Sequence, residues 1–325
     1  MTPTGGTRGG IDLGGTKIQT VIVDGSNQVL GEARRPTPTE GGPEVVSAEM
    51  AAALREAAEQ AKVTSESLAG IGVGSPGDAD ESTGVVSGAR NLPGWAGSFP
   101  LAERLSGEFG TTVKVGNDVQ VAVEGEFHLG AGRPFRSLVG VFWGTGVGGG
   151  LVLDGKPWLG RGAAGEIGHV VVRRGGPTCS AGHSGCMEAY AGRSSMERKA
   201  REEAARGTKT KLFEIMEERG RDRLSSGIWE RALKHGDPLA ENLIDRAIKA
   251  LAAGIASTVN LLDPEAVILG GGMGTRFGEQ YLPKIGKRMR GHLFAPDDPP
   301  ELRLAELGDL GGAIGAALLV ADQRA

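Results

Sequence analysis

Short apolar runs and glycine turns alternate along the first part of the chain. Two strand-like runs flank a turn at 14–17 that holds two glycines and a lysine, which predicts a β-hairpin. Behind Pro43, apolar positions recur at helical spacing through 43–62, which predicts an amphipathic helix. The other elements predicted for this part are a strand at 69–74, a helix at 101–109, a strand at 112–115 and a helix at 119–129. A meander followed by alternating helices and strands is typical of an α/β domain.

The second half of the chain repeats this opening. An apolar run at 137–143 leads into the glycine-rich turn 144–150, after which a strand resumes at 151–155. The later elements predicted are a long helix at 238–262, a strand at 266–269, a strand at 302–307 and a helix at 312–320. Two halves that open in the same way predict a duplicated, two-domain α/β fold.

The bulk properties narrow the class of protein. The length of 325 residues suits two domains of roughly 150 residues each. We expect an N-terminal domain at 1–129, completed by the C-terminal helix 311–325, and a larger domain at 130–310. A net charge of −4 and the lack of long basic runs predict no binding to nucleic acid or to a membrane. No signal core and no apolar run of about 18 residues occur, so we expect a cytoplasmic protein.

The glycines gather at the ends of predicted strands, where they permit tight turns and close approach of the backbone to ligands. The turns at 14–17 and 144–150 can present backbone N–H groups to a polyphosphate, because no side chain blocks the approach. Asp12 can orient a Mg²⁺ ion through water, Lys17 can offset phosphate charge, and Thr145 can donate its hydroxyl. Glycine hairpins are also common without a ligand, so neither turn decides the function alone.

Residues 144–149 also have the spacing Gly-x-Gly-x-x-Gly, which occurs in dinucleotide-binding folds. That motif must open a helix, whereas residues 151–155 predict a strand and a turn. No Gly-x-x-x-x-Gly-Lys-Ser/Thr loop occurs in the chain. Nicotinamide binding is therefore a weak alternative.

Asn117 and Asp118 follow a predicted strand and precede a predicted helix, the position at which open α/β sheets bind ligands. Asp118 can serve as the N-cap of that helix. Alternatively, the helix N-terminus keeps its carboxylate ionised, so that it can accept a proton from a substrate hydroxyl. The neighbouring asparagine and the phosphate-type turns favour the second role.

One short segment carries Glu166, His169, Cys179, Cys186 and Glu188, and it includes both cysteines of the chain. Carboxylates and a neutral imidazole can bind the hydroxyls of a polyol, while thiolates and imidazoles bind zinc. The segment therefore predicts substrate binding and a metal site together.

Five motifs resemble, in order, those of the ROK family (repressors, open reading frames, kinases). They are Asp12-Leu13-Gly14-Gly15-Thr16-Lys17, Gly116-Asn117-Asp118, Gly144-Thr145-Gly146-Val147-Gly148-Gly149, Glu166-Ile167-Gly168-His169 and Gly185-Cys186-Met187-Glu188. The resemblance covers essentially the whole chain. It implies an actin-like ATPase (ribonuclease H-like) fold with two duplicated domains around a cleft, with sugar between the domains and ATP mainly against the second. It also implies a homodimer or homotetramer.

The resemblance implies a role for each matching residue. Asp118 would be the catalytic base that acts on the sugar hydroxyl. The other sugar-binding residues would be Gly77, Asn91, Asn117, Glu166, His169 and Glu188. The residues facing ATP and its Mg²⁺ would be Asp12, Gly14, Gly15, Thr16, Lys17, Gly144, Thr145 and Gly146, with Gly271 and Gly272 against the adenosine.

The Glu-x-Gly-His form of the fourth motif is similar to that of glucokinases. The leading prediction is therefore ATP-dependent phosphorylation of glucose at its 6-hydroxyl. The alternatives are fructose, mannose, allose or an N-acetylhexosamine as the sugar, polyphosphate as the donor, or a non-catalytic sugar sensor. The repressor branch needs a helix-turn-helix before the first turn, and only about ten residues precede Ile11, so we expect a kinase.

The family's zinc pattern is a histidine followed by Cys-x-Cys-Gly-x-x-Gly-Cys. His169, Cys179 and Cys186 match it, but Ala181 stands where the second cysteine is expected. A four-coordinate zinc then needs another ligand, and His183 is the nearest candidate. The alternative is that zinc is lost and the two thiols only lie close together. Bound zinc would hold the second ring nitrogen of His169 toward a sugar hydroxyl.

Overall fold

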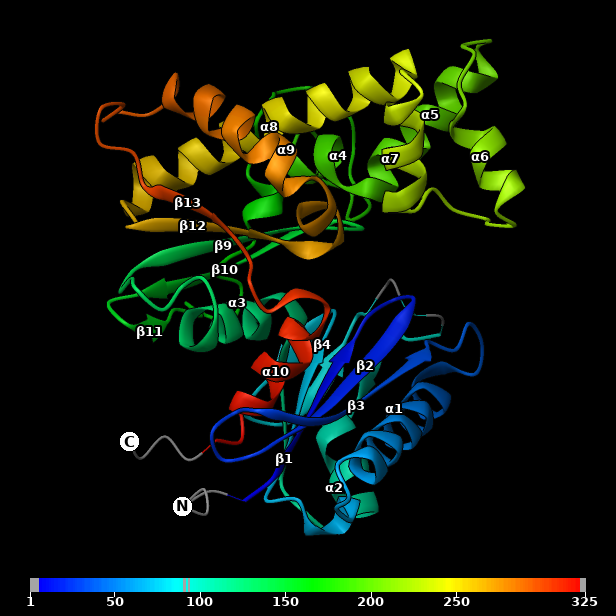
Figure 1. Ribbon diagram of the computed structural model, residues 1–325, viewed down its shortest axis with the longest axis vertical. Helices are drawn as coiled ribbons and strands as arrows, with labels where there is room; N and C mark the ends of the chain where they lie inside the picture. Colours follow the sequence, from blue (N-terminus) through cyan, green and yellow to red (C-terminus); the bar gives the residue numbers. More distant parts are fainter. Residues whose placement is uncertain (1–5, 90–91, 93, 322–325) are drawn as a thin grey trace. The chain divides into compact units, whose positions relative to one another are not determined.

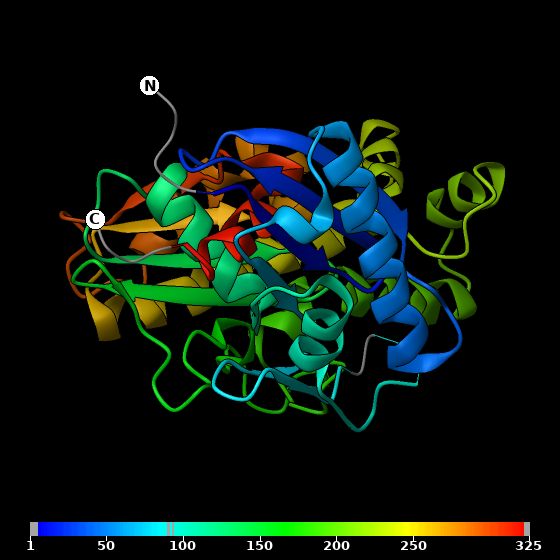
Figure 2. The same cartoon turned by 90° about the horizontal axis from the view of Figure 1, so that it is seen from below.

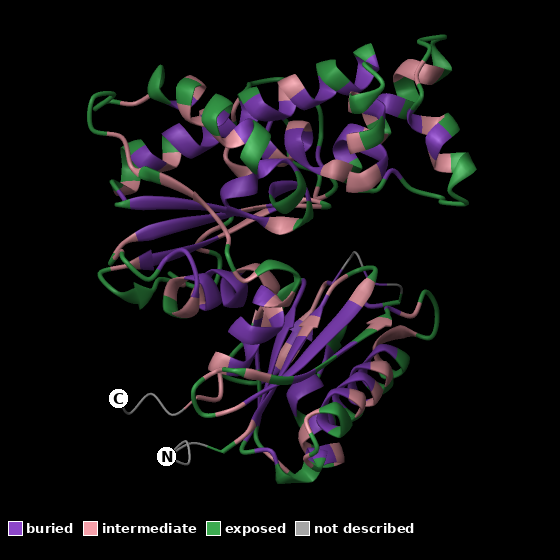
Figure 3. Ribbon diagram, in the orientation of Figure 1, coloured by how far each residue is buried: buried purple, intermediate pink, exposed green. Residues whose placement is uncertain are grey.

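The computed structural model of the chain describes residues 6–89, 92 and 94–321, which form two compact units. The first unit comes from Met1–Arg133 and Glu306–Ala325, and the second from Pro134–Ala305 (Figure 1). Each unit is built on a five-stranded sheet whose central strands are buried (Figure 3). Among the described residues, no helix combines the length and the apolar character needed to cross a membrane.

The main sheet of the first unit has the strand order β3-β2-β1-β4-β8. Its strands are β1 (Arg8–Leu13), β2 (Lys17–Val23), β3 (Val29–Pro36), β4 (Ile71–Ser75) and β8 (Val113–Asn117). The first three strands form an antiparallel meander, and β4 and β8 extend the sheet parallel to β1. A small sheet between β4 and β8 in the chain consists of β5 (Asp78–Asp80), β6 (Val85–Ser87) and β7 (Ser98–Phe99).

Helices cover both faces of this main sheet (Figures 1 and 2). They are α1 (Gly42–Gln60), α2 (Leu101–Phe109), α3 (Asp118–Leu129) and α10 (Gly311–Leu318). Along β2, Ile18 and Ile22 belong to the core that contains α1 and α2, whereas Val21 and Val23 pack with α10. Successive strand side chains point to opposite faces, so a single apolar strand supplies both cores.

The C-terminal helix α10 lies very close to the sheet. A Cβ atom at Gly10 of β1 would collide with the backbone carbonyl of Ala313, and one at Gly72 of β4 with that of Ala316. Glycine at these two strand positions therefore permits the contact. This packing makes α10 part of the first unit, although it lies at the far end of the sequence.

The second unit repeats the topology of the first, with the strand order β11-β10-β9-β12-β13. Its strands are β9 (Leu138–Trp143), β10 (Val147–Leu153), β11 (Lys156–Pro157), β12 (Ala266–Gly270) and β13 (Glu301–Leu304). Its helices are α4 (Met187–Ala191), α5 (Arg193–Ala205), α6 (Leu212–Glu218), α7 (Ser226–Lys234), α8 (Pro238–Leu262) and α9 (Gly271–Arg290). An antiparallel meander followed by parallel strands occurs in both units, which confirms the predicted duplicated α/β fold.

One predicted detail of the second unit was wrong, and one helix was missed. The glycine turn ends sooner than expected, because β10 begins at Val147 and includes Gly148–Gly150. Gly149 serves a close contact within the unit, since a Cβ atom there would lie 2.7 Å from the Gly165 carbonyl oxygen. The long helix α9 was not predicted, because its glycines and the internal Pro283 weaken the helical signal.

A single buried glutamate, Glu126 of α3, makes hydrogen bonds with both segments that connect the units. Its carboxylate accepts hydrogen bonds from the N–H groups of Ala131 (3.0 Å), Glu306 (3.0 Å) and Leu307 (2.8 Å). Its backbone carbonyl accepts from the N–H groups of Gly130 (3.0 Å) and Gly132 (2.9 Å). The chain leaves the first unit just after the first of these segments and re-enters it at the second. The compact units consequently divide after Arg133 and before Glu306, a few residues from the boundaries at 129 and 310 suggested by the sequence.

We expect Glu126→Gln to lower the free energy of unfolding by about 2–4 kcal/mol, because a glutamine has one acceptor oxygen where three N–H groups, buried or partly buried, need partners. Urea unfolding followed by circular dichroism measures the change.

The matched control is Glu124→Gln, because Glu124 lies two residues before Glu126 on the same helix. Burial raises the pKa of the Glu124 carboxyl to about 7, with Gln120 lowering it and Glu81 raising it. The native state therefore loses stability as pH rises from the ordinary glutamate range through 7, because the carboxyl group must then ionise while buried. Glu124→Gln removes this ionisation, so it should stabilise the protein at pH 8 but not at pH 4. Equal effects of the two substitutions would contradict the anchoring role of Glu126.

Candidate active site

The carboxyl ends of three parallel strands carry predicted site residues of the first unit. Asp12 of β1 is level with Gly74 of β4, and Ser75 of β4 is level with Asn117 of β8. Open α/β sheets bind their ligands at this edge. The sheet therefore brings Asp12 to the same edge as Asp118, the first residue of α3.

The first glycine turn has two backbone N–H groups available for a ligand. The Gly14 N–H donates to the Lys17 carbonyl at 2.9 Å, and the Thr37 hydroxyl donates to the Gly14 carbonyl at 2.6 Å. The N–H groups of Gly15 and Thr16 have no acceptor within the part of the chain that the structure describes. A phosphate oxygen can therefore bind at this turn.

Asp12 is half-buried beside this turn, and burial raises the pKa of its carboxyl to about 6. Lys17 lowers that pKa and Asp309 raises it, while Lys17 Nζ itself lies 3.7 Å from Asp309 Oδ2. A Cβ atom at Gly312 would lie 2.7 Å from Asp12 Cγ, so glycine at the start of α10 makes room for the carboxyl group. A carboxylate in this place suits a Mg²⁺ ion held through water.

Asn117 is the N-cap of α3, a role that the sequence also allowed for Asp118. Asn117 Oδ1 accepts hydrogen bonds from the N–H groups of Val119 (3.0 Å) and Gln120 (3.1 Å). Asp118 Oδ1 accepts from the same Val119 N–H at 2.9 Å. A carboxylate in the first turn of a helix is stabilised in its ionised form.

The sequence also predicts Gly77 and Asn91 as sugar-binding residues of the first unit, and the structure describes the first of them. Gly77 lies between β4 and β5 with a φ of +88°, and a Cβ atom there would lie 2.6 Å from the Ser87 carbonyl oxygen. The backbone thus requires glycine at this position. Asn91 lies outside the described residues.

In the second unit, the start of α9 lies beside the second glycine turn. A Cβ atom at Gly144 would lie 3.9 Å from the backbone nitrogen of Gly272. Gly271 has a φ of +81°, and a Cβ atom there would lie 2.7 Å from the Trp143 carbonyl oxygen. The structure thus brings together the two segments predicted to contact ATP in this unit.

This second turn also offers N–H groups. The Gly144 N–H donates to the Gly146 carbonyl at 3.0 Å. Across the described ranges, the N–H groups of Thr145 and Gly146 have no acceptor. Both glycine turns therefore share the property that anion binding requires.

The carboxylates of the second unit lie near this turn and near His169. Glu188 Oε2 accepts a hydrogen bond from the Val147 N–H at 3.1 Å, and its Oε1 accepts from the Ser180 hydroxyl at 3.0 Å. Glu166 Oε2 lies 3.8 Å from His169 Nε2. His169 therefore faces Glu166 with Nε2, while its Nδ1 has other partners.

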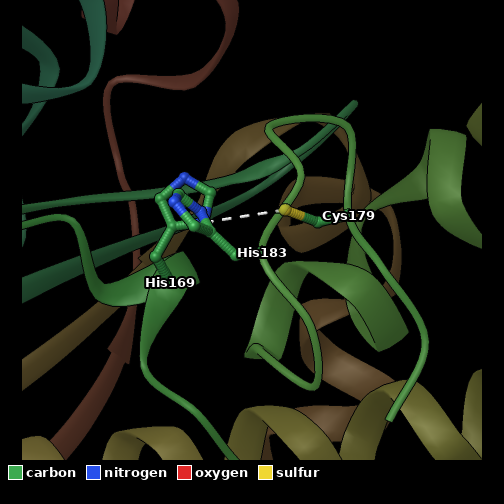
Figure 4. Close-up of side chains that lie close together, drawn as sticks. All are labelled: His169, Cys179 and His183. Atoms are coloured by element: carbon green, nitrogen blue, oxygen red, sulfur yellow. Dashed lines mark hydrogen bonds between the residues drawn. The ribbon is translucent and has the colours of Figure 1, made fainter. Parts of the chain in front are cut away.

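That other nitrogen belongs to a cluster of possible metal ligands, in which His169, Cys179 and His183 point toward one another (Figure 4). His169 Nδ1 lies 3.2 Å from His183 Nδ1 and 3.9 Å from Cys179 Sγ. Two nitrogens bound to one tetrahedral zinc lie about 3.3 Å apart, and a nitrogen and a sulfur about 3.6 Å. The observed spacing fits a zinc ion.

Cys186 is buried with Cys179 and Ala189 in a small apolar cluster against which the partly buried Ala181 packs, but among the described residues the ligand atoms that converge within 4.8 Å are those of His169, Cys179 and His183. Both cysteines are free thiols. Burial raises the pKa of the Cys186 thiol to about 11, and the neighbouring Cys179 acts in the same direction. Metal binding would release the thiol protons, because the thiolate is the ligand.

Comparison with known proteins decides the family. A model of the ROK family matches residues 8–323. The chain belongs to the ROK family. The glucokinase of Halalkalibacterium halodurans is 32% identical over 97% of this chain and 94% of that protein. The N-acetylgalactosamine kinase AgaK of Shewanella sp. is 32% identical over 95% of each chain.

The fold agrees with this membership. A ROK family glucokinase from Streptomyces griseus, solved in complex with glucose and AMPPNP, matches the structure with a TM-score of 0.81 at 31% identity. The match covers 97% of this chain and 99% of that chain. The predicted actin-like ATPase fold with two duplicated domains is thereby confirmed.

Sequence reasoning missed the side chains of Thr37 and Asp309, which contact predicted site residues of the first unit, and two that do so in the second unit. Ser180 lies within the cysteine segment and binds Glu188. Arg193, the first residue of α5, donates from Nη2 to the Thr145 hydroxyl at 2.8 Å. An arginine directly after Gly192 at a helix start was the available signal, but nothing in the sequence indicates that α5 begins beside the glycine turn.

The raised pKa of Asp12 leads to a stability prediction. The native state holds the Asp12 proton more tightly than the unfolded chain, so its ionised form costs stability as pH rises from the ordinary aspartate range through about 6. Asp12→Asn should raise the free energy of unfolding by about 1–2 kcal/mol at pH 8 and leave it unchanged near pH 3. Urea unfolding at both pH values measures this difference.

Asp309→Asn is the matched control, because Asp309 is exposed and its loss should change stability far less. A destabilising effect of Asp12→Asn at pH 8 would show that the carboxylate has a stabilising partner in the native protein, contrary to this account.

Proposed function

We propose that this ROK protein transfers the γ-phosphoryl group of ATP to the 6-hydroxyl of glucose. The observation that carries the proposal is the placement of Asp118 at the start of α3, on the same sheet edge as the Asp12 end of β1. The glucokinase relatives and the glucose and AMPPNP complex of the Streptomyces griseus protein support this sugar and this donor.

Asp118 would act as the general base in this reaction. The dipole of α3 favours a negative charge at its N-terminus, and the carboxylate of Asp118 would accept a hydrogen bond from the sugar hydroxyl. The proton moves late, because a loose phosphoryl-transfer transition state requires little activation of the nucleophile. Asn117 supplies the helix cap and accepts the Gln120 N–H, and Asp118 Oδ1 shares the Val119 N–H with it.

The remaining sugar hydroxyls would bind to Asn117 in the first unit and to Glu166, His169 and Glu188 in the second. Asn117 Oδ1 is occupied by the cap, so its amide N–H₂ would be the donor. Two carboxylates, an amide and an imidazole make a site that leaves buried polar groups unpaired when the wrong sugar binds. Gly77 and Asn91 would line the same site.

The donor would be held by the two glycine turns and the start of α9. The N–H groups of Gly15, Thr16, Thr145 and Gly146 would bind phosphate oxygens, and Gly14 and Gly144 shape those turns. Lys17 would offset phosphate charge, Asp12 would orient Mg²⁺ through water, and Gly271 and Gly272 would lie against the adenosine.

A different hexose is the second candidate, because the AgaK relative is as similar in sequence as the glucokinase relative. Fructose, mannose, allose and N-acetylhexosamines remain to be compared with glucose, and polyphosphate with ATP.

We also propose that zinc binds His169, Cys179, Cys186 and His183, with His183 replacing the family cysteine at Ala181. The donor spacing supports this set, since three of its ligand atoms already lie within 4.8 Å of one another. The zinc would fix the His169 ring through Nδ1 and leave Nε2 directed toward Glu166 and a sugar hydroxyl.

The kinase assignment predicts sugar-dependent ADP release, measured with a coupled assay on a hexose panel. Glucose should give the highest kcat/KM, and Asp118→Asn should lower kcat by about 10²–10⁴. Asp154→Asn, in the exposed turn after β10, is the control and should match the wild type. No release above background with any sugar would refute the kinase assignment, and a wild-type kcat for Asp118→Asn would refute the role of Asp118 as the base.

The zinc assignment predicts about one zinc per chain in protein purified without chelator, measured by elemental analysis. His183→Ala should lose this zinc, because three ligands remain, whereas His235→Ala, in the loop after α7, should retain it. Wild-type protein without zinc, or full zinc content in His183→Ala, would exclude the proposed ligand set.

A further inference from the structure

The backbone N–H groups of Arg193 and Ser194 bind carbonyl oxygens of the second glycine turn. The Arg193 N–H donates to the Gly144 carbonyl at 3.1 Å, and the Ser194 N–H donates to the Thr145 carbonyl at 3.0 Å. Both donors belong to the first turn of α5, whose N–H groups have no partner inside the helix. These two hydrogen bonds occupy the carbonyl oxygens of Gly144 and Thr145 and offset their partial negative charge. The N–H groups of the same turn stay available for an anion.

The side chain of Arg193 reaches the same turn. Nη2 donates to Thr145 Oγ1 at 2.8 Å, and Nη1 donates to the Leu224 carbonyl at 2.9 Å. A guanidinium has donors only, so it fixes the Thr145 oxygen as an acceptor of this hydrogen bond. The hydroxyl hydrogen must then be given to a different group. Thr145 is exposed, so that group can be a ligand.

The charge on Arg193 has no carboxylate partner within 4 Å among the described residues. The guanidinium is half-buried, and burial lowers its pKa, with Glu197 opposing this effect and Arg223 reinforcing it. Arginine nevertheless stays protonated in proteins. A desolvated cation without an ion pair is unusual, and an anion at the exposed Thr145 would lie next to it.

We propose that Arg193 is a positioning residue for the donor polyphosphate, which holds Thr145 as a hydrogen-bond donor and adds positive charge behind the turn. This inference rests on the proposed binding of phosphate at the second glycine turn. It assigns Arg193 to the nucleotide and not to the sugar, so its loss should affect one substrate selectively.

The test is steady-state kinetics with separate variation of ATP and glucose for Arg193→Met, Arg193→Lys, Thr145→Val and the Arg193→Met/Thr145→Val double variant. Arg193→Met should lower kcat/KM for ATP by about 10- to 100-fold, as expected for the loss of a charge-assisted hydrogen bond, and change KM for glucose less than about 2-fold. Arg193→Lys should recover part of the loss, because it keeps the charge but not the two-branched contact. The double variant should be no worse than the poorer single variant, since Arg193 acts through Thr145.

Arg201→Met is the matched control. Arg201 lies on the same helix and also donates to a carbonyl of the 220s loop, that of Asp222, but contacts neither glycine turn. It should retain wild-type kinetics, and thermal unfolding of all variants shows that they are folded.

Three results would overturn the inference while the kinase assignment stands. They are an Arg193→Met variant with wild-type kcat/KM for ATP, equal losses for both substrates, and multiplicative losses in the double variant. The kinase assignment itself fails separately, if no sugar of the hexose panel raises ADP release above background.

Discussion

The hydrogen bonds of Glu126 hold together the two segments at which the chain passes between the units. Three N–H groups from two distant segments converge on one buried carboxylate, and two more donate to the carbonyl of the same residue. Unpaired, these donors would each carry a desolvation cost of about 1–3 kcal/mol. Because Glu126 lies on α3, the helix that begins with Asp118, the connecting segments and the proposed catalytic base share one rigid element.

Much of the fold could be predicted from periodicity and turns. The first hairpin, α1, α2 and α8 have strong local signals, so their predicted and observed bounds agree within a few residues. The helix α9 could not be predicted, because its glycines lower helical propensity and its burial against the second sheet outweighs that cost. Gly148–Gly150 looked like a turn because the sequence does not show that Gly149 lies against Gly165.

The candidate site shows the same limit. The motifs identified the individual residues, but only the structure shows which contacts each of them makes. Asn117 and Asp118 are equally good caps by composition, and only the direction of their oxygens shows that Asn117 binds two N–H groups of α3. His183 was a candidate ligand by proximity in the sequence, whereas the 3.2 Å between its Nδ1 and that of His169 is a property of the folded loop.

The two glycine turns show how a duplicated fold can diverge in its supporting contacts. In the first turn, the Thr37 hydroxyl binds the Gly14 carbonyl, and the nearby cation Lys17 lies 3.7 Å from the exposed Asp309 carboxylate. In the second, helix N–H groups occupy the carbonyls, and none of the described residues places a carboxylate within 4 Å of the nearby cation Arg193. An exposed ion pair is weak and screened, so Lys17 can exchange Asp309 for another anion. Arg193 is half-buried, so an anion bound beside Thr145, as proposed, would stabilise it more strongly than an exposed anion stabilises Lys17.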